Sequence, residues 1–153
     1  MASYIRPKVP GACVFFTVNL ANRGARTLVE HVDVLREAVR VTKAERPFRI
    51  DAWVVLPDHM HAVWALPEGD HDFSTRWSVI KARFSRAMPN TPRRRSHGER
   101  REHGLWQRRF WERHIRDDVD WANHVNYCWI NPVKHGYVER PEDWPYSSYH
   151  RDR

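Results

Sequence analysis

The stretch FRIDAWVVLPDHMHAVWAL, residues 48–66, consists of two apolar segments separated by a Pro-Asp pair. β-Branched and aromatic residues dominate both halves, 48–56 and 59–66, as is typical of strands. Pro57 has a restricted φ and Asp58 favours a turn, so the two halves are predicted to form a hairpin. Because both faces of the hairpin are apolar, we expect it to lie centrally in a sheet and to be covered on at least one side.

The segments around this hairpin predict further strands and helices. Strands are predicted at 11–23 and 105–115, and helices at 27–45, 72–88 and 116–136. In the first helix, apolar side chains recur at helical spacing, and Thr27 with Glu30 is predicted to form an N-terminal capping box. The Asn131-Pro132 pair is expected to end the last helix.

The resulting order is strand, helix, strand, strand, helix, strand, helix. Its first six elements predict an α+β fold with a ferredoxin-like split βαβ core, in which helices cover one face of an antiparallel sheet. The last helix is an addition that must dock elsewhere on the sheet. A chain of 153 residues fits one domain over 1–153, with an aromatic C-terminal tail at 137–153.

The charge of the chain favours a polyanionic partner. The formal net charge is +7 and the sequence pI is about 9.9, which suits nucleic acid or an anionic membrane surface. No apolar run approaches the roughly 20 residues needed to span a bilayer, and the N-terminus lacks the apolar region of a secretory signal. We therefore expect a cytoplasmic protein that binds nucleic acid and not a membrane. Two isolated cysteines, Cys13 and Cys128, agree with a reducing compartment.

Two histidines, His59 and His61, interrupt the apolar pattern of the hairpin. Residues i and i+2 of a strand point to the same face, so the two imidazoles are expected to lie side by side. This placement suits two ligands of one cation, although two hydrogen-bonded structural histidines would give the same pattern. Two ligands are too few for a closed structural zinc site, whereas an open site completed by another group is the catalytic arrangement.

The last predicted helix carries a tyrosine and an asparagine one turn apart. At ~100° per residue, Ala122, Val125 and Trp129 form its expected buried stripe, while Tyr127 and Asn131 point away from the core. A tyrosine hydroxyl can attack phosphorus, and a cation can neutralise the charge that develops. Each residue also has a simpler interpretation, as a surface tyrosine and a C-capping asparagine.

Basic residues predict a surface for phosphate groups. The segment 89–104 contains five arginines and no residue suited to a core, so a mobile loop is predicted. The candidates for phosphate contacts are Arg76, Lys81, Arg83, Arg86, Arg93, Arg94, Arg95, Arg108 and Arg109. Such contacts add affinity without reading sequence.

Aromatic residues alternate with arginines in the fourth predicted strand. Trp106, Phe110 and Trp111 interleave with Arg108, Arg109 and Arg113, a pattern that suits stacking on unpaired bases. The alternative is that these aromatic rings belong to the core, and for Trp106 and Phe110 we favour it.

Two motifs carry a resemblance to a known family. LPDHMHAVW (56–64) resembles the His-hydrophobic-His motif of the single-tyrosine HUH endonucleases, and NYCWINPVKHGYV (126–138) resembles the tyrosine helix of the REP-associated tyrosine transposases. The likeness continues in PGACVFFTVNL (10–20), LWQRRFWERHI (105–115) and EDWPYSSYH (142–150), so it covers nearly the whole chain.

The resemblance implies a Mg²⁺- or Mn²⁺-dependent enzyme that cleaves and joins single-stranded DNA near palindromic hairpins, as a monomer or homodimer. It makes His59 and His61 metal ligands and Tyr127 the nucleophile of a 5′-phosphotyrosine intermediate. In the wider group a Gln one turn after the tyrosine completes the metal site; Asn131, a shorter amide, holds that place here. Mn²⁺ tolerates mixed nitrogen and oxygen ligands better than Mg²⁺ does.

Two other functions fit the same residues. One is a domesticated protein that binds DNA hairpins with little catalysis. The other is an unrelated metal-dependent hydrolase that uses the histidine pair, for which Tyr127 would be dispensable.

Overall fold

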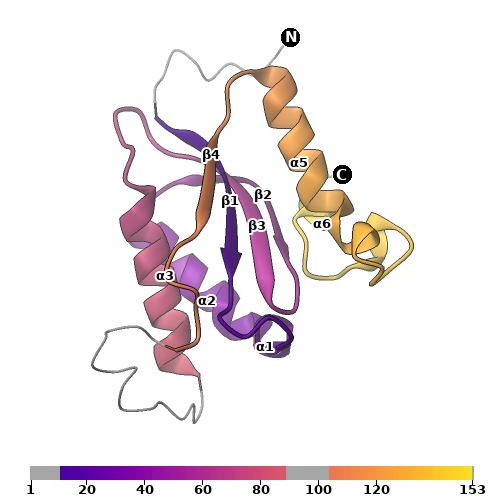
Figure 1. Cartoon of the computed structure of the whole chain (residues 1–153). Coiled ribbons are helices and arrows are strands. Elements are labelled where there is room, and N and C mark those ends of the chain that lie inside the picture. The colour runs from indigo at the N-terminus through magenta and orange to yellow at the C-terminus, as the bar shows by residue number, and fades with distance from the viewer. Residues whose placement is uncertain (1–10, 89–103, 153) are drawn as a thin grey trace.

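The computed structural model describes residues 11–88 and 104–152, which form a four-stranded antiparallel sheet with helices on both faces (Figure 1). The strands are β1 (Cys13–Asn19), β2 (Arg49–Val55), β3 (His59–Ala65) and β4 (Trp111–His114). Their order across the sheet is β2-β3-β1-β4. This order, with a helical crossover after β1 and another after β3, confirms the predicted α+β fold with a ferredoxin-like split βαβ core.

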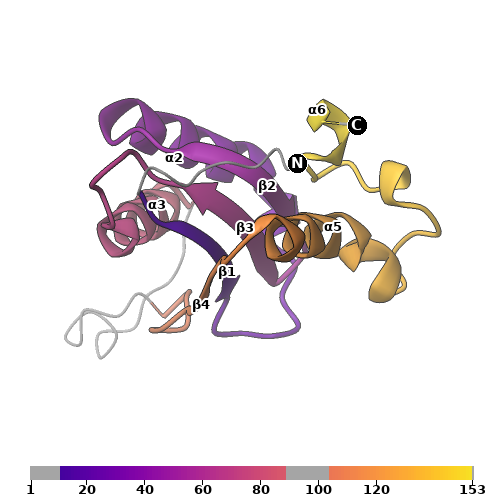
Figure 2. The same ribbon diagram turned by 90° about the horizontal axis from the view of Figure 1, so that it is seen from above.

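The helices lie in two layers. They are α1 (Thr27–Glu30), α2 (Val32–Glu45), α3 (Phe73–Ala87) and α5 (Asp118–Lys134), followed by the 3-10 turn η1 (Pro141–Asp143) and α6 (Tyr149–Asp152). α2 and α3 pack together on one face of the sheet, and α5 crosses the other face over β2 and β3 (Figure 2). The added C-terminal helix therefore covers the face that the split βαβ core leaves open.

Side chains of β3 point alternately to the two faces of the sheet, so this strand contributes residues to both helix layers. Met60 and Trp64 point to the layer of α2 and α3, where the Trp64 ring stacks on Trp77 of α3 with centroids 4.4 Å apart. His59 and His61 point to the opposite face, toward α5. The two-residue period of a strand thus places a wholly apolar row in the main core and an imidazole pair under the last helix.

The helix predicted at 27–45 is broken at His31 into α1 and α2. Thr27 is the first helical residue, and the N-cap, Arg26, makes no side-chain capping bond. The predicted capping box of Thr27 and Glu30 is therefore wrong. The physical reason is a tertiary contact, because the backbone N–H of Leu28 donates to the carbonyl of Pro57 in the hairpin turn.

The fourth predicted strand, 105–115, is shorter in the structure. Only Trp111–His114 pairs continuously with β1, while Trp106 makes a separate bridge to Leu20. Between these points the chain bends and turns the ring of Phe110 toward Phe16 in the core, with centroids 5.8 Å apart. Packing of one aromatic ring therefore interrupts the ladder.

The helix α5 continues through Pro132 to Lys134, so the expectation that Asn131-Pro132 ends it is wrong. Proline removes one N–H donor, and in the last turns of a helix this affects few backbone bonds. The backbone reverses at Gly136, whose φ of 81° lies in the left-handed region that favours glycine.

Three further expectations concern membrane-spanning segments, the arginine-rich segment and the two cysteines. Within 11–88 and 104–152, no helix has the length and hydropathy to span a bilayer. The arginine-rich segment predicted as a mobile loop, 89–104, lies outside the described residues except for its last position. Cys13 and Cys128 are both buried, and neither forms a disulfide with the other.

The guanidinium of Arg76 anchors the start of α3. Its five donors all find acceptors: both carboxylate oxygens of Asp70 and the backbone carbonyls of Arg46, Pro47 and Asp72. The residue is 4% exposed. This guanidinium cannot also bind a phosphate, so the prediction that Arg76 contacts DNA is wrong, and its role is to join α3 to the segment before β2.

Replacement of Arg76 by methionine tests this role. Arg76→Met keeps most of the side-chain volume but leaves the Arg46 and Pro47 carbonyls without these donors, so we expect the free energy of unfolding to fall by about 1.5–3 kcal/mol. Urea denaturation measures the change, with Arg86→Met on the exposed side of the same helix as the control. An equal loss in both variants would contradict the anchoring role.

Candidate active site

The hairpin turn delivers the two histidines to one place. His59 is the first residue of β3, opposite Asn19 of β1, and His61 lies opposite Thr17. Both residues are only 5% exposed, and their ring centroids are 5.1 Å apart. The structure therefore brings the imidazoles together on one face, as the spacing predicted.

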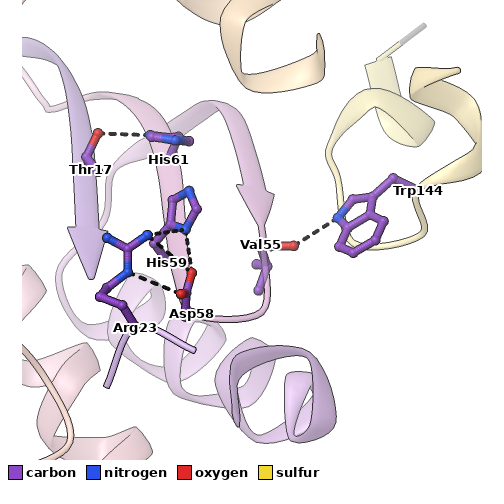
Figure 3. Close-up of polar contacts among 7 residues, drawn as sticks. All are labelled: Thr17, Arg23, Val55, Asp58, His59, His61 and Trp144. Carbon is purple, nitrogen blue, oxygen red and sulfur yellow. Dashed lines mark hydrogen bonds and ion pairs between the residues drawn. The ribbon is translucent and has the colours of Figure 1, made fainter. Parts of the chain in front are cut away.

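The ring of His59 is oriented by a carboxylate at the end of the hairpin turn (Figure 3). Its Nδ1 lies 2.7 Å from Oδ1 of Asp58, and Arg23 donates to the other Asp58 oxygen at 3.1 Å. Nη2 of Arg23 also lies 3.4 Å from the same Nδ1. Because an ionised carboxylate can only accept, the shorter contact assigns the proton to Nδ1 of His59.

The ring of His61 is held from the neighbouring strand. Its Nδ1 lies 2.9 Å from Oγ1 of Thr17 on β1 (Figure 3). When Nδ1 carries the proton in both rings, the two Nε2 lone pairs are free to bind a cation. A carboxylate or hydroxyl on the second ring nitrogen is the arrangement that orients histidine ligands in metal sites.

Burial keeps both imidazoles neutral. It lowers the pKa of His61 to about 3, and the charges of His59 and His135 act in the same direction. Burial also lowers the pKa of His59, although the hydrogen bond that its Nδ1–H donates to Asp58 opposes this shift. For Asp58, burial alone would raise the pKa, but the hydrogen bonds of His59 and Arg23 lower it overall. Neutral imidazole beside an ionised carboxylate is the ligating state.

The helix α5 places Tyr127 over the histidine pair. The phenol ring meets the His61 ring edge-on with centroids 5.2 Å apart, and it also contacts Phe15 at 5.8 Å. The residue is 37% exposed, so Tyr127 lies at the boundary between the protein and solvent. Nζ of Lys134 lies 5.5 Å from the ring centroid, where its positive charge can attract a phosphate. The expected convergence of tyrosine and histidines is therefore present.

Asn131 is fully buried, which corrects the expectation that it points away from the core. The buried face of α5 is formed by Val125, Cys128 and Asn131, because Trp129 is instead covered by the C-terminal segment through Tyr149 and Ser148. Nδ2 of Asn131 is 3.5 Å from the Tyr127 carbonyl, and its buried Oδ1 has no hydrogen-bond partner in the described chain. A buried amide oxygen without a partner is costly unless something binds it.

A third histidine lies at the edge of the pair. His135, the C-cap of α5, faces His59 with ring centroids 5.3 Å apart and stacks on Tyr137. Sequence reasoning missed His135, because nothing in the linear pattern shows that the end of the last helix returns to the hairpin. Within the described ranges, however, no three histidine, cysteine or acidic side chains form a metal-binding group.

The basic residues predicted to bind DNA are dispersed. Nζ of Lys81 donates to the Gln107 carbonyl, and Arg83 binds Thr42 and Glu45 across the helix layer. Arg86, Arg108 and Arg109 are exposed. Arg93, Arg94 and Arg95 lie outside the described residues. Because α3 packs on the face opposite the histidines, its basic side chains do not line the site.

A basic groove lies at the β2 edge of the sheet, the edge away from β4. Sequence reasoning missed this groove. Its volume is about 370 Å³, and its walls come from α2, β2 and the C-terminal segment, including Arg36, Arg40, Lys43 and Tyr146. Two of these charges already face acids within α2, since Arg36 lies 3.9 Å from Asp33 and Arg40 lies 2.6 Å from Glu37. The groove is separate from the candidate active site, because His59, His61 and Tyr127 do not line it.

Comparison with known proteins gives a consistent set of relatives. The chain is 48% identical to the REP-associated tyrosine transposase of Escherichia coli K12, over 99% of this chain and 85% of that protein. It is 44% identical to a Haemophilus influenzae protein named for the same family, over 99% and 88% of the two chains. No family model matches the sequence.

Two solved structures resemble the fold. A REP-associated tyrosine transposase bound to a REP hairpin superposes with a TM-score of 0.80 at 47% identity, covering 99% of this chain and 85% of that chain. A crystal structure of a protein from Deinococcus radiodurans R1, described as a transposase, gives a TM-score of 0.50 at 14% identity over 83% and 92% of the two chains. At that identity the second likeness shows the fold alone.

The depressed pKa of His61 predicts a loss of stability in acid. The folded protein keeps His61 neutral down to about pH 3, whereas the unfolded chain takes up the proton below its ordinary value near 6.5. Unfolding is therefore favoured progressively as pH falls from 6.5 toward 3, by about 1.4 kcal/mol per pH unit.

The variant His61→Gln isolates this contribution because glutamine does not titrate. In metal-free buffer, the unfolding free energy of the original protein relative to the variant is expected to drop by about 2 kcal/mol between pH 7 and pH 5. Urea denaturation at both pH values measures it. A difference that stays constant with pH would show that His61 does not remain neutral in the fold.

Proposed function

The chain belongs to the REP-associated tyrosine transposases, and we propose that it cleaves and rejoins single-stranded DNA beside palindromic hairpins. In this proposal Tyr127 is the nucleophile, and His59 and His61 hold a Mg²⁺ or Mn²⁺ ion. The observation that carries the proposal is the 5.2 Å approach of the Tyr127 ring to the His61 ring. In this way α5 and the β2–β3 hairpin, which are remote in sequence, bring the proposed nucleophile and the two proposed metal ligands close together.

The residues of the site fit a divalent cation. Two Nε2 lone pairs are free when the Nδ1–H of His59 donates to Asp58 and the Nδ1–H of His61 donates to Thr17, and Asn131 offers a buried amide oxygen without a partner. We propose these three groups as ligands, with oxygens of the DNA and water completing the shell. When bound, the cation supplies positive charge to the non-bridging oxygens of a phosphodiester. Mn²⁺ accepts this mixed set more readily than Mg²⁺.

The chain's own residues then position the reaction. The hydroxyl oxygen of Tyr127 forms a bond to phosphorus as the bond from phosphorus to the 3′-oxygen breaks. The phenol loses one proton and the leaving 3′-oxygen gains one, so the products are a 5′-phosphotyrosine and a free 3′-hydroxyl. Attack by a different 3′-hydroxyl reverses the step and joins two strands. Lys134, beside the phenol, helps to bind the anionic DNA.

One chain contains every residue of this proposed site, because α5 and the hairpin come from the same molecule. A monomer can therefore carry out cleavage without a partner subunit. The hairpin substrate is proposed from the REP hairpin held by the solved relative and from the net charge of +7 of this chain. Phosphate contacts of this kind weaken steeply with salt.

Removal of one oxygen tests the nucleophile. Tyr127→Phe keeps the ring that packs on His61 and Phe15 but has no hydroxyl to attack phosphorus. With Mn²⁺ and hairpin-bearing single strands, the unaltered protein should form a covalent DNA adduct visible by denaturing electrophoresis, and the variant should form none while binding the hairpin equally well. A persisting adduct would exclude Tyr127. Hairpin binding without any adduct in the unaltered protein would indicate a DNA-binding protein with little catalysis.

Replacement of Asn131 tests the third ligand. Asn131→Leu has a similar volume and no amide oxygen, so it should lower the affinity for Mn²⁺ by about tenfold or more. Isothermal titration with Mn²⁺ alone measures this without any reaction. Asn123→Leu, on the exposed side of the same helix, is the matched control. Unchanged Mn²⁺ affinity in the Asn131 variant would remove it from the metal site.

A further inference from the structure

Trp111 is exposed to an unusual degree for its size. It is 72% exposed, whereas the other seven tryptophans of the chain are buried or half-buried. In the described part of the chain, its ring contacts no other aromatic ring and no cation. Full burial of so large a ring would stabilise the fold by a few kcal/mol, so this fold leaves a large apolar surface unused.

The position of Trp111 relates it to the proposed site. Strand pairing places Trp111 of β4 opposite Thr17 of β1, and Thr17 opposite His61 of β3. Opposite residues of an antiparallel pair share a face, so the tryptophan lies in the same row and on the same face as His61. Two strand spacings, about 10 Å, separate the Cα atoms of His61 and Trp111.

The helix above the sheet leaves this part of the face uncovered. α5 packs mainly over β2 and β3, and β4 is the outer strand next to β1 (Figure 1). The Tyr127 ring of α5 contacts the rings of Phe15 and His61 on the sheet, so these side chains fill the space between the helix and the histidines. A DNA strand that reaches the Tyr127 hydroxyl from the β4 side must therefore pass Trp111.

The surroundings of Trp111 favour an anionic strand. Arg113, two residues further along β4, shares its face and has a half-exposed side chain with one 3.3 Å contact to Asp120. Arg109, two residues before it, is exposed. An exposed ring between cations matches the way single-stranded nucleic acid is bound, with bases on aromatic faces and phosphates on basic groups.

We propose that Trp111 is a stacking surface for one unpaired base of the DNA strand that enters the site. By holding that base, it positions the adjoining backbone between the Tyr127 hydroxyl and the histidine pair. This inference rests on the proposed function, because it identifies a contact to the same DNA. The contact requires an unpaired base, since the bases of a duplex are stacked on one another and cannot cover the ring.

The experiment compares single-stranded and duplex DNA in a Tyr127→Phe background, so that no strand is cut. The probes are a 12-residue oligothymidylate and a duplex of the same length, because stacking tolerates any base. Trp111→Ala should weaken binding to the oligothymidylate by roughly 5- to 150-fold and leave duplex binding unchanged. Trp111→Phe should retain most of the affinity, and Val119→Ala, an exposed apolar residue of α5, should have no effect.

Fluorescence provides a second readout that does not require the alanine variant to fold. The oligothymidylate should quench an exposed tryptophan signal in the Tyr127→Phe protein, and the quenching should be lost with Trp111→Phe. Equal weakening of single-stranded and duplex binding, no weakening, or quenching that persists without Trp111 would each overturn the proposal. Because these are binding measurements, they remain decisive even if the protein forms no covalent adduct, which tests the proposed function separately.

Discussion

The edge-on contact between Tyr127 and His61 joins the last helix to the sheet, and the geometry of the site depends on it. The imidazole belongs to the central hairpin and the phenol to a helix added after the split βαβ core. Phe15, from the strand beside His61, packs against the tyrosine and His124. Two rings of the helix are thereby fixed against two rings of the sheet, which sets the position of the hydroxyl.

This arrangement requires that polar groups be buried beneath the helix. The fold provides a partner for the Nδ1 atom of each histidine, from the turn or the adjacent strand, and it leaves the Asn131 Oδ1 atom without a hydrogen-bond partner among the described residues. Buried polar atoms without partners destabilise a protein. Two buried imidazoles on the face that α5 covers, together with this unpartnered amide oxygen of α5, are the pattern expected when function and stability compete.

Sequence periodicity was sufficient for the architecture because the elements are long and their apolar patterns are regular. The two-residue spacing of His59 and His61 predicted a shared face, and the wheel of the last helix predicted that Tyr127 would leave the main core. The wheel was wrong for Asn131, because the C-terminal segment covers Trp129 and turns the buried face toward Cys128. The packing of that segment is a tertiary effect that periodicity does not contain.

Tertiary packing also explains why the sequence pattern gave the wrong role for Arg76 and did not reveal His135. Arg76 looks like a surface cation in a helical wheel, but the loops before β2 and α3 saturate its guanidinium. His135 approaches His59 only because α5 runs past Pro132 and ends beside the hairpin. In contrast, the exposure of Trp111 follows from strand alternation. Its neighbour Phe110 points to the core and contacts Phe16, so Trp111 points to the opposite face.

Anomalous diffraction from crystals soaked in Mn²⁺ would test the central claim most directly. The account predicts one strong peak at bonding distance from Nε2 of both His59 and His61, on the side of the Tyr127 ring. A peak elsewhere, or imidazoles that bind no ion while their Nε2 atoms face other protein groups, would contradict it.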